Sequence, residues 1–222
     1  AVGQDGTPSR VSAVYTLPER QSFVVALRDT PEVWELSFAD GRRPAHAPRR
    51  ILAQDFLDDF SFTPGGEYLL ATSRKAKGGQ VIHMPSGRVT ADIPLPGMPH
   101  LGSGIYWQRD GRWVFATPNI GAGLVSVLDI GSWELLREIP TEGPGFFMRS
   151  HPNSRYAWTD VFFGPNNDAV HLIDKQTLEL AHTLRPMPGK NAAHVEFTHD
   201  GRHLVLSVWD TDGALIVYDS ST

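Results

Sequence analysis

The sequence contains no cysteine. This absence excludes disulfides, thiolate-bound zinc and covalent attachment of a c-type haem, although it leaves the redox compartment open. Basic residues are also scarce, with 20 Lys and Arg against 25 Asp and Glu, and the net charge of -5 argues against a nucleic-acid-binding surface. No apolar run approaches the roughly 20 residues that a membrane-spanning helix needs. We therefore predict neither nucleic-acid binding nor a transmembrane segment.

Long amphipathic helical patterns are missing as well. The apolar residues occur in short β-branched and aromatic runs bounded by Gly, Asp, Asn and Pro, which is typical of strands and turns. A turn followed by a large residue recurs four times, with spacings of 45, 43 and 47 positions between successive large residues. These residues are Tyr68, Trp113, Tyr156 and His203. A period in the forties with turns of this kind is typical of β-propeller blades.

The repeats predict an all-β fold, a β-propeller segment of four blades and most of a fifth. The predicted blades cover residues 1–50, 51–95, 96–141, 142–186 and 187–222, and the last of these is incomplete. Open sheet edges promote aggregation unless they are covered. We therefore expect further blades or a second chain to complete the ring. The start at Ala1 shows no initiator Met and no signal pattern, which predicts a processed or truncated terminus.

Four stretches that precede the first strands of successive repeats are expected to converge on the propeller axis. They are residues 55–59, 97–104, 143–149 and 191–196. The second contains His100 among glycines and prolines, where the backbone can approach a flat ligand closely. An imidazole with a pKa near neutrality can protonate a substrate or ligate iron. The alternative is a turn histidine that is bonded to the backbone.

Asp58 and Asp59 are predicted to be neighbours on a strand. Their side chains would then point to opposite faces, so they cannot form a catalytic pair. Asp58 is the one we expect to face the channel, where burial would raise the pKa of its carboxyl and let it act as acid or base. The alternative, which we expect for Asp59, is a strand-entry aspartate that hydrogen-bonds a turn.

Five segments, in order and with matching spacing, resemble the haem d1 domain family. They are Asp55-Phe-Leu-Asp58, Met98-Pro-His-Leu-Gly-Ser-Gly104, Gly145-Phe-Phe-Met-Arg-Ser-His-Pro-Asn-Ser154, His194-Val-Glu-Phe197 and Ser207-Val-Trp209. The family comprises the eight-bladed, WD40-like d1 propeller of cytochrome cd1 nitrite reductase and its biosynthetic relatives NirF and NirN. The resemblance covers the C-terminal part of that propeller. It implies haem d1, or a precursor iron tetrapyrrole, as ligand and the periplasm as location.

The resemblance also implies roles for single residues. Two distal histidines lie over the haem iron in the reductases. One corresponds to His100, which is therefore the candidate iron ligand and proton donor, and the other corresponds to Asp58. An arginine of the reductases corresponds to Ser103. Nitrite reduction uses both histidines, so Asp58 argues against that activity. The proximal iron ligand falls in the part of the propeller outside this chain.

Further pocket residues follow from the same resemblance. Phe147 and Trp209 match apolar residues around the macrocycle, where ring stacking supplies binding energy, although blade core is the alternative. His194 replaces a non-histidine pocket residue, or caps a strand. Arg10 and Arg149 could pair with macrocycle carboxylates, although surface arginines are common. The remaining histidines that we assign to turns and strands are His151, His171, His182, His199 and His203.

Two stretches, Gly143-Pro-Gly-Phe-Phe147 and Ala192-Ala-His-Val-Glu196, are more similar to the NirF branch. The leading prediction is therefore a tetrapyrrole-binding protein of haem d1 biosynthesis for denitrification, with His100 and Asp58 as proton donor and acceptor in a late step. Expected partners are other haem d1 biosynthesis proteins or nitrite reductase. One alternative is a catalytic fragment of a nitrite reductase or of a NirN-like dihydro-haem d1 dehydrogenase. Another is a propeller scaffold without chemistry, because fold does not imply function.

Overall fold

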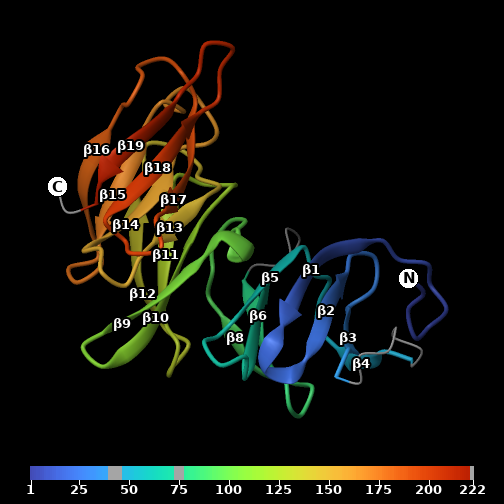
Figure 1. Cartoon of the computed structure of the whole chain (residues 1–222). Coiled ribbons are helices and arrows are strands. Elements are labelled where there is room, and N and C mark those ends of the chain that lie inside the picture. The colour runs from blue at the N-terminus through green and yellow to red at the C-terminus, as the bar shows by residue number, and fades with distance from the viewer. Residues whose placement is uncertain (40–46, 73–77, 221–222) are drawn as a thin grey trace. The chain divides into compact units, whose positions relative to one another are not determined.

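A computed structural model describes residues 1–39, 47–72 and 78–220. Within these ranges the chain forms five antiparallel sheets, four with four strands and the last with three (Figure 1). The predicted all-β propeller segment with four blades and an incomplete fifth is confirmed. The chain divides into two compact units, Ala1–Pro96 and Gly97–Thr222.

The first unit contains two sheets. The first sheet consists of β1 (Val11–Leu17), β2 (Ser22–Leu27), β3 (Glu32–Ser37) and β4 (Arg49–Leu52), with the 3-10 turn η1 (Pro18–Arg20) between β1 and β2. The second consists of β5 (Asp59–Phe62), β6 (Tyr68–Thr72), β7 (Gly79–His83) and β8 (Arg88–Ile93). The boundary predicted after residue 50 falls inside β4, whose Ile51 pairs with Val33. The Pro- and Arg-rich stretch before Ile51, which the sequence predicts to be a connector between blades, includes residues 40–46, and these lie outside the described residues.

The second unit contains the other three sheets. The third sheet consists of β9 (Ile105–Arg109), β10 (Arg112–Pro118), β11 (Leu124–Asp129) and β12 (Leu135–Pro140), and the 3-10 turn η2 (Leu101–Ser103) precedes it. The fourth consists of β13 (Met148–Ser150), β14 (Tyr156–Asp160), β15 (Val170–Asp174) and β16 (Glu179–Leu184). The fifth consists of β17 (Ala192–Phe197), β18 (His203–Val208) and β19 (Leu215–Asp219).

Apolar side chains between neighbouring sheets form the core. In the first unit Leu17, Phe60 and Leu69 belong to one buried cluster shared by both sheets. In the second unit Trp158 of β14 packs with Val195 and Leu204 of the fifth sheet. Burying a side chain of this size stabilises the fold by roughly 1.5–3 kcal/mol. Within each unit, adjacent blades are therefore held together by face-to-face packing.

The strand order determines which loops lie together. Each sheet is an antiparallel meander, so the segment that enters its first strand and the loop between its second and third strands lie at the same end. In the second unit this end carries the segments before β9, β13 and β17 and the loops that follow β10, β14 and β18. His100, Phe147, His194 and Trp209, all predicted from the sequence, belong to these segments or directly adjoin them.

Candidate functional site

Aromatic side chains gather at this end of the fourth and fifth sheets. They are Phe146, Phe147, Phe162, Phe163 and Trp209. The ring centroids of Phe146 and Phe162 are 5.3 Å apart, and Trp209 lies 5.4 Å from Phe162 and 6.0 Å from Phe147. Such spacings are favourable for tilted and edge-to-face ring pairs. Phe163 and Trp209 are nevertheless 41% and 47% exposed, so the cluster forms an apolar surface rather than blade core.

His100 adjoins this cluster. Its ring centroid is 4.1 Å from that of Phe146, and its Nδ1 lies 2.6 Å from the carbonyl oxygen of Phe146. Because a carbonyl oxygen can only accept, Nδ1 carries a proton, and in the neutral ring the lone pair is on Nε2. Nε2 is thus the nitrogen that could take a proton or bind a metal. His100 is half-buried.

The loop geometry around His100 is fixed by the chain on both sides. The backbone N–H of His100 donates to the carbonyl of Pro118, and its carbonyl accepts from the N–H of Ser103. Asn119, which is fully buried, accepts the N–H of Met98 at its Oδ1. Gly97 has a φ of +65°, and a Cβ there would lie 2.7 Å from the Asn119 side chain. Glycine is therefore required at position 97 to place His100.

Asp160 lies beneath the aromatic segment and is 1% exposed. Its Oδ1 accepts the backbone N–H of Phe146 at 2.7 Å and that of Phe147 at 3.0 Å, whereas its buried Oδ2 has no hydrogen-bond partner. Burial raises the pKa of Asp160 to about 6. The two N–H donors and the nearby His100 lower this pKa. The backbone N–H of His194 also lowers it, although its geometry does not meet the criteria for a hydrogen bond to Oδ2. Desolvation outweighs them all.

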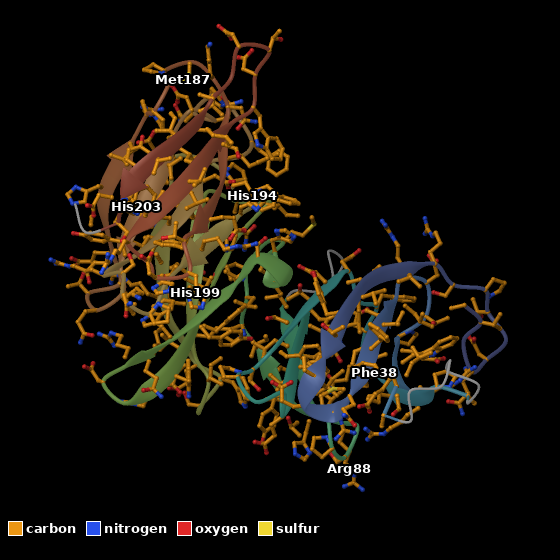
Figure 2. The ribbon with its side chains drawn as sticks, viewed as in Figure 1. Phe38, Arg88, Met187, His194, His199 and His203 are labelled. Atoms are coloured by element: carbon orange, nitrogen blue, oxygen red, sulfur yellow. The ribbon has the colours of Figure 1, made fainter. Side chains whose placement is uncertain are left out.

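His194 is the second histidine of the site. It lies at a bulge in β17 with a φ of +63°, stacks on Phe147 and places its Nε2 3.1 Å from Oε1 of Glu196. The same Glu196 oxygen accepts from Nε of Arg149 at 3.0 Å. Figure 2 shows His194 of β17 well apart from His203 of β18 and from His199 in the turn between these two strands. The structure thus brings together four of the predicted residues, Phe147, Trp209, His194 and Arg149, with His100 alongside.

The whole chain, residues 1–222, matches the family described as the cytochrome D1 heme domain. The chain belongs to this family.

Two curated relatives share sequence with most of the chain. The dihydro-heme d1 dehydrogenase of Pseudomonas aeruginosa is 63% identical over 220 residues, which is 99% of this chain and 44% of that protein. Protein NirF of the same organism is 31% identical over 222 residues, with 95% of this chain and 54% of that protein covered. The chain therefore spans about half the length of these relatives. The predicted preference for the NirF branch is not supported, because identity to the dehydrogenase is about twice as high.

A solved structure agrees with the sequence comparison. Dihydro-heme d1 dehydrogenase NirN in complex with DHE matches with a TM-score of 0.95 and 63% identity, covering 99% of this chain and 47% of that chain. The short stretches that favoured NirF in the sequence, around Phe147 and His194, are too few to represent the chain as a whole.

Other predicted residues lie elsewhere in this d1-family chain. Ser103 is 4% exposed in η2, directly after His100. Arg10 belongs to the first unit, where it forms a bidentate pair with Asp29 that holds the pKa of that carboxyl well below its usual range. Asp58 also belongs to the first unit. The expectation that it lies on a strand with Asp59 is wrong, because β5 begins at Asp59, and the N–H of Asp58 donates to Thr72.

Asp160 is the residue that sequence reasoning missed. A signal was present in the repeats. The residues four positions after Tyr68, Trp113, Tyr156 and His203 are Thr72, Thr117, Asp160 and Ser207, respectively. Three repeats carry a small hydroxyl at this strand end and the fourth carries a carboxylate. A charged residue at a position where the other repeats have Thr or Ser indicates a role specific to that blade.

A cavity lies at the opposite end of the third and fourth sheets, away from the aromatic cluster. It has a volume of about 540 Å³, and its lining includes Tyr106, Trp107, Trp113, His151, Arg155 and Lys175. None of the predicted site residues lines it. Within the described ranges, no group of three or more His, Cys, Asp or Glu side chains could hold a metal ion. A single histidine such as His100 suits a metal whose other ligands come from a macrocycle.

Proposed function

We propose that this chain is the macrocycle-binding part of a dihydro-haem d1 dehydrogenase, in which a haem d1 precursor lies against His100 and the aromatic cluster. The observation that carries the proposal is the 63% identity over 99% of the chain to the Pseudomonas aeruginosa dehydrogenase. The match to the same enzyme solved in complex with DHE supports a ligand of this class. NirF, at 31% identity, supports the same biosynthetic context.

The residues present fit a flat, partly charged ligand. The exposed faces of Phe163 and Trp209 and the half-buried rings of Phe146 and Phe147 offer an aromatic surface for a conjugated macrocycle. Arg149 lies beside them. Its Nε donates to the exposed Glu196 and its Nη1 to the carbonyl of Met148, and its guanidinium could also pair with a macrocycle carboxylate. Nε2 of His100 could ligate the iron. An iron tetrapyrrole supplies extended conjugation, which spreads the charge that develops when hydrogen is removed.

The proton steps are assigned to this chain. Removing two hydrogen atoms from a dihydro substrate releases two protons and two electrons, and the electrons pass one at a time to two equivalents of an external one-electron oxidant. His100 can accept one proton at Nε2 only while Nε2 is not bound to iron, because Nδ1 donates to the Phe146 carbonyl and the ring has a single lone pair. Asp58, which the family resemblance aligns with a distal histidine, is the second acceptor in this proposal. The family resemblance also favours a periplasmic location, and no helix among the described residues is long and apolar enough to cross a membrane.

The experiment is a visible absorption titration of the purified chain with dihydro-haem d1, followed by addition of ferricyanide as oxidant. We expect a saturable spectral shift and then conversion to the haem d1 spectrum. In His100→Ala and in Asp58→Asn we expect a small loss of affinity for dihydro-haem d1 and a larger loss in the rate of its conversion to haem d1. Binding without conversion in any form would favour a NirF-like role. No spectral shift in the wild-type chain would overturn the proposal.

A further inference from the structure

One peptide group joins two titratable side chains of the site. The carbonyl of Phe146 and the N–H of Phe147 belong to the same peptide bond. The carbonyl oxygen accepts the hydrogen bond from Nδ1 of His100 at 2.6 Å, and the N–H donates to Oδ1 of Asp160 at 3.0 Å. The imidazole and the buried carboxylate are therefore linked through a single planar amide.

The amide can transmit the effect of the carboxylate. Its C–N bond has partial double-bond character, so a negative charge that accepts from the N–H shifts electron density toward the carbonyl oxygen. That oxygen becomes a better acceptor for Nδ1–H. The 2.6 Å contact is shorter than the usual 2.9–3.0 Å of N–H to O bonds, in the direction expected for charge assistance. Burial strengthens the effect because the local dielectric is low.

The segment that carries the amide is held from both sides. The N–H of Phe146 donates to the same Oδ1 of Asp160, and the carbonyl of Phe147 accepts from the backbone N–H of Asp160 and the hydroxyl of Thr159. The peptide between Phe146 and Phe147 therefore has little freedom to rotate. Its carbonyl stays directed at His100.

We propose that Asp160 is a positioning residue for His100, acting through the Phe146–Phe147 peptide group. It holds the imidazole in the Nδ1–H tautomer and fixes the direction in which Nε2 points. In catalytic triads an aspartate fixes the tautomer and orientation of a histidine through a direct hydrogen bond. Here the carboxylate has the same effect through one intervening amide. The inference rests on the proposed function to the extent that His100 is the residue that meets the substrate.

Two further observations support this role. The buried Oδ2 of Asp160 has no hydrogen-bond partner, and leaving such an atom unpaired is unfavourable unless the carboxylate serves another purpose. The equivalent positions of the other repeats hold Thr72, Thr117 and Ser207. A hydroxyl is therefore sufficient for the blade at this strand end, and the charge of Asp160 is an addition specific to the blade beside His100.

The test is a ¹⁵N NMR measurement of the His100 imidazole tautomer in the chain without ligand at alkaline pH, comparing wild type with Asp160→Asn. Asparagine keeps the acceptor oxygen and removes the charge. We expect the ¹⁵N shifts of the wild type to show the proton on Nδ1 and those of the variant to show a loss of this preference. His100→Gln assigns the resonances.

A matched control separates the relay from general effects of a lost buried charge. Asp129 is also buried and its Oδ1 also accepts two backbone N–H groups, from Gly131 and Ser132, but it lies at the opposite end of the third sheet. Asp129→Asn should leave the His100 tautomer unchanged. If Asp160→Asn does not fold, Asp160→Ser supplies the hydroxyl that the other repeats carry and should give the same loss of tautomer preference.

The outcomes are independent of the proposed function. An unchanged tautomer of His100 in a folded Asp160 variant, or an equal change in Asp129→Asn, would overturn the positioning role of Asp160 even if the chain binds dihydro-haem d1. Failure of the wild-type chain to bind would overturn the proposed function while leaving the tautomer result standing. Where the chain does convert substrate, Asp160→Asn should lower kcat about tenfold or more with the substrate Kd changed less than threefold.

Discussion

The imidazole of His194 lies almost parallel to the ring of Phe147, with centroids 4.5 Å apart and 23° between the ring planes. This stack joins the fourth sheet to the fifth at the end where the aromatic cluster is exposed. His194 makes the contact from a left-handed backbone conformation, with φ at +63°. A conformation of this kind is unfavourable by about 1 kcal/mol for a non-glycine residue. The stack and the contact with Glu196 offset that strain.

Substitutions at His194 should therefore separate strain from stacking. His194→Ala removes the stack but keeps the strained backbone, whereas His194→Gly removes both. We expect the glycine variant to have a free energy of unfolding about 1 kcal/mol higher than the alanine variant. Both should bind the macrocycle with similarly reduced affinity, because both lose the ring. Urea denaturation and absorption titration measure the two effects, and an alanine variant as stable as the glycine variant would show that the φ is not strained.

Trp209 should contribute to macrocycle binding through its exposed face. Trp209→Ala is expected to weaken binding about tenfold, which corresponds to roughly 1.4 kcal/mol for loss of an aromatic contact. Trp113 is a matched control, since it is 41% exposed against 47% for Trp209 but lines the cavity at the other end of the blades. Trp113→Ala should leave the dissociation constant unchanged. Equal losses in both variants would place the ligand elsewhere.

Gly97 should be intolerant of a side chain. Its φ of +65° is unfavourable for alanine, and the added Cβ would meet Asn119, whose buried Oδ1 already holds the N–H groups of Met98 and Gly121. Gly97→Ala should lower the free energy of unfolding by about 2 kcal/mol or more.

Gly121 provides the control for this substitution. It lies in the loop between β10 and β11, where its N–H shares the Oδ1 of Asn119 with Met98, and a Cβ there would make only ordinary contacts at 3.4 Å and beyond. Gly121→Ala should change stability by less than about 1 kcal/mol, consistent with the effect of glycine replacement at an unstrained position. Thermal and urea unfolding measure both variants. A neutral Gly97→Ala would mean that the loop before His100 is not fixed in the way described.

The raised pKa of Asp160 should make stability depend on pH. The folded chain holds this proton up to about pH 6, whereas the unfolded chain loses it near its ordinary value of 3.8. Between these values the folded state binds more protons, so the free energy of unfolding falls as pH rises. The difference in pKa corresponds to about 3 kcal/mol.

Asp160→Asn isolates this contribution. The free energy of unfolding of wild type minus that of the variant should decrease by about 2.4 kcal/mol between pH 4 and pH 7, because asparagine does not titrate and part of the total change lies below pH 4. Urea denaturation at several pH values gives the difference directly. A difference that stays constant or grows with pH would show that the carboxyl is not held in its protonated form by burial.

Much of the fold could be predicted because the strands repeat. Each blade carries the same sequence of short apolar runs and a turn before a large residue, so the sheets follow from the period alone. The strand β4 was missed because Pro48 and the arginines 49 and 50 before Ile51 give the segment the composition of a connector. Pairing with β3 and packing of Ile51 in the core override that local signal.

The site was less accessible from sequence. The exposed aromatic segment around Phe147 and the position of His100 could be anticipated from glycine and proline in the entering loops and from the family resemblance. The hydrogen bond between His100 and the Phe146 carbonyl could not, because it joins residues 46 positions apart and depends on how two blades pack. Asp160 was missed for a similar reason, since its burial and its two backbone donors exist only in the folded sheet.

The measurement that tests the account most directly is the titration of the purified chain with dihydro-haem d1, followed at visible wavelengths, with wild type compared with His100→Ala. A saturable shift in the wild type, altered in band position in the variant, is the predicted result, because it would place the macrocycle over His100 at the aromatic end of the blades. An identical shift in both proteins would contradict the account of the site. No shift in either would contradict binding of the macrocycle altogether.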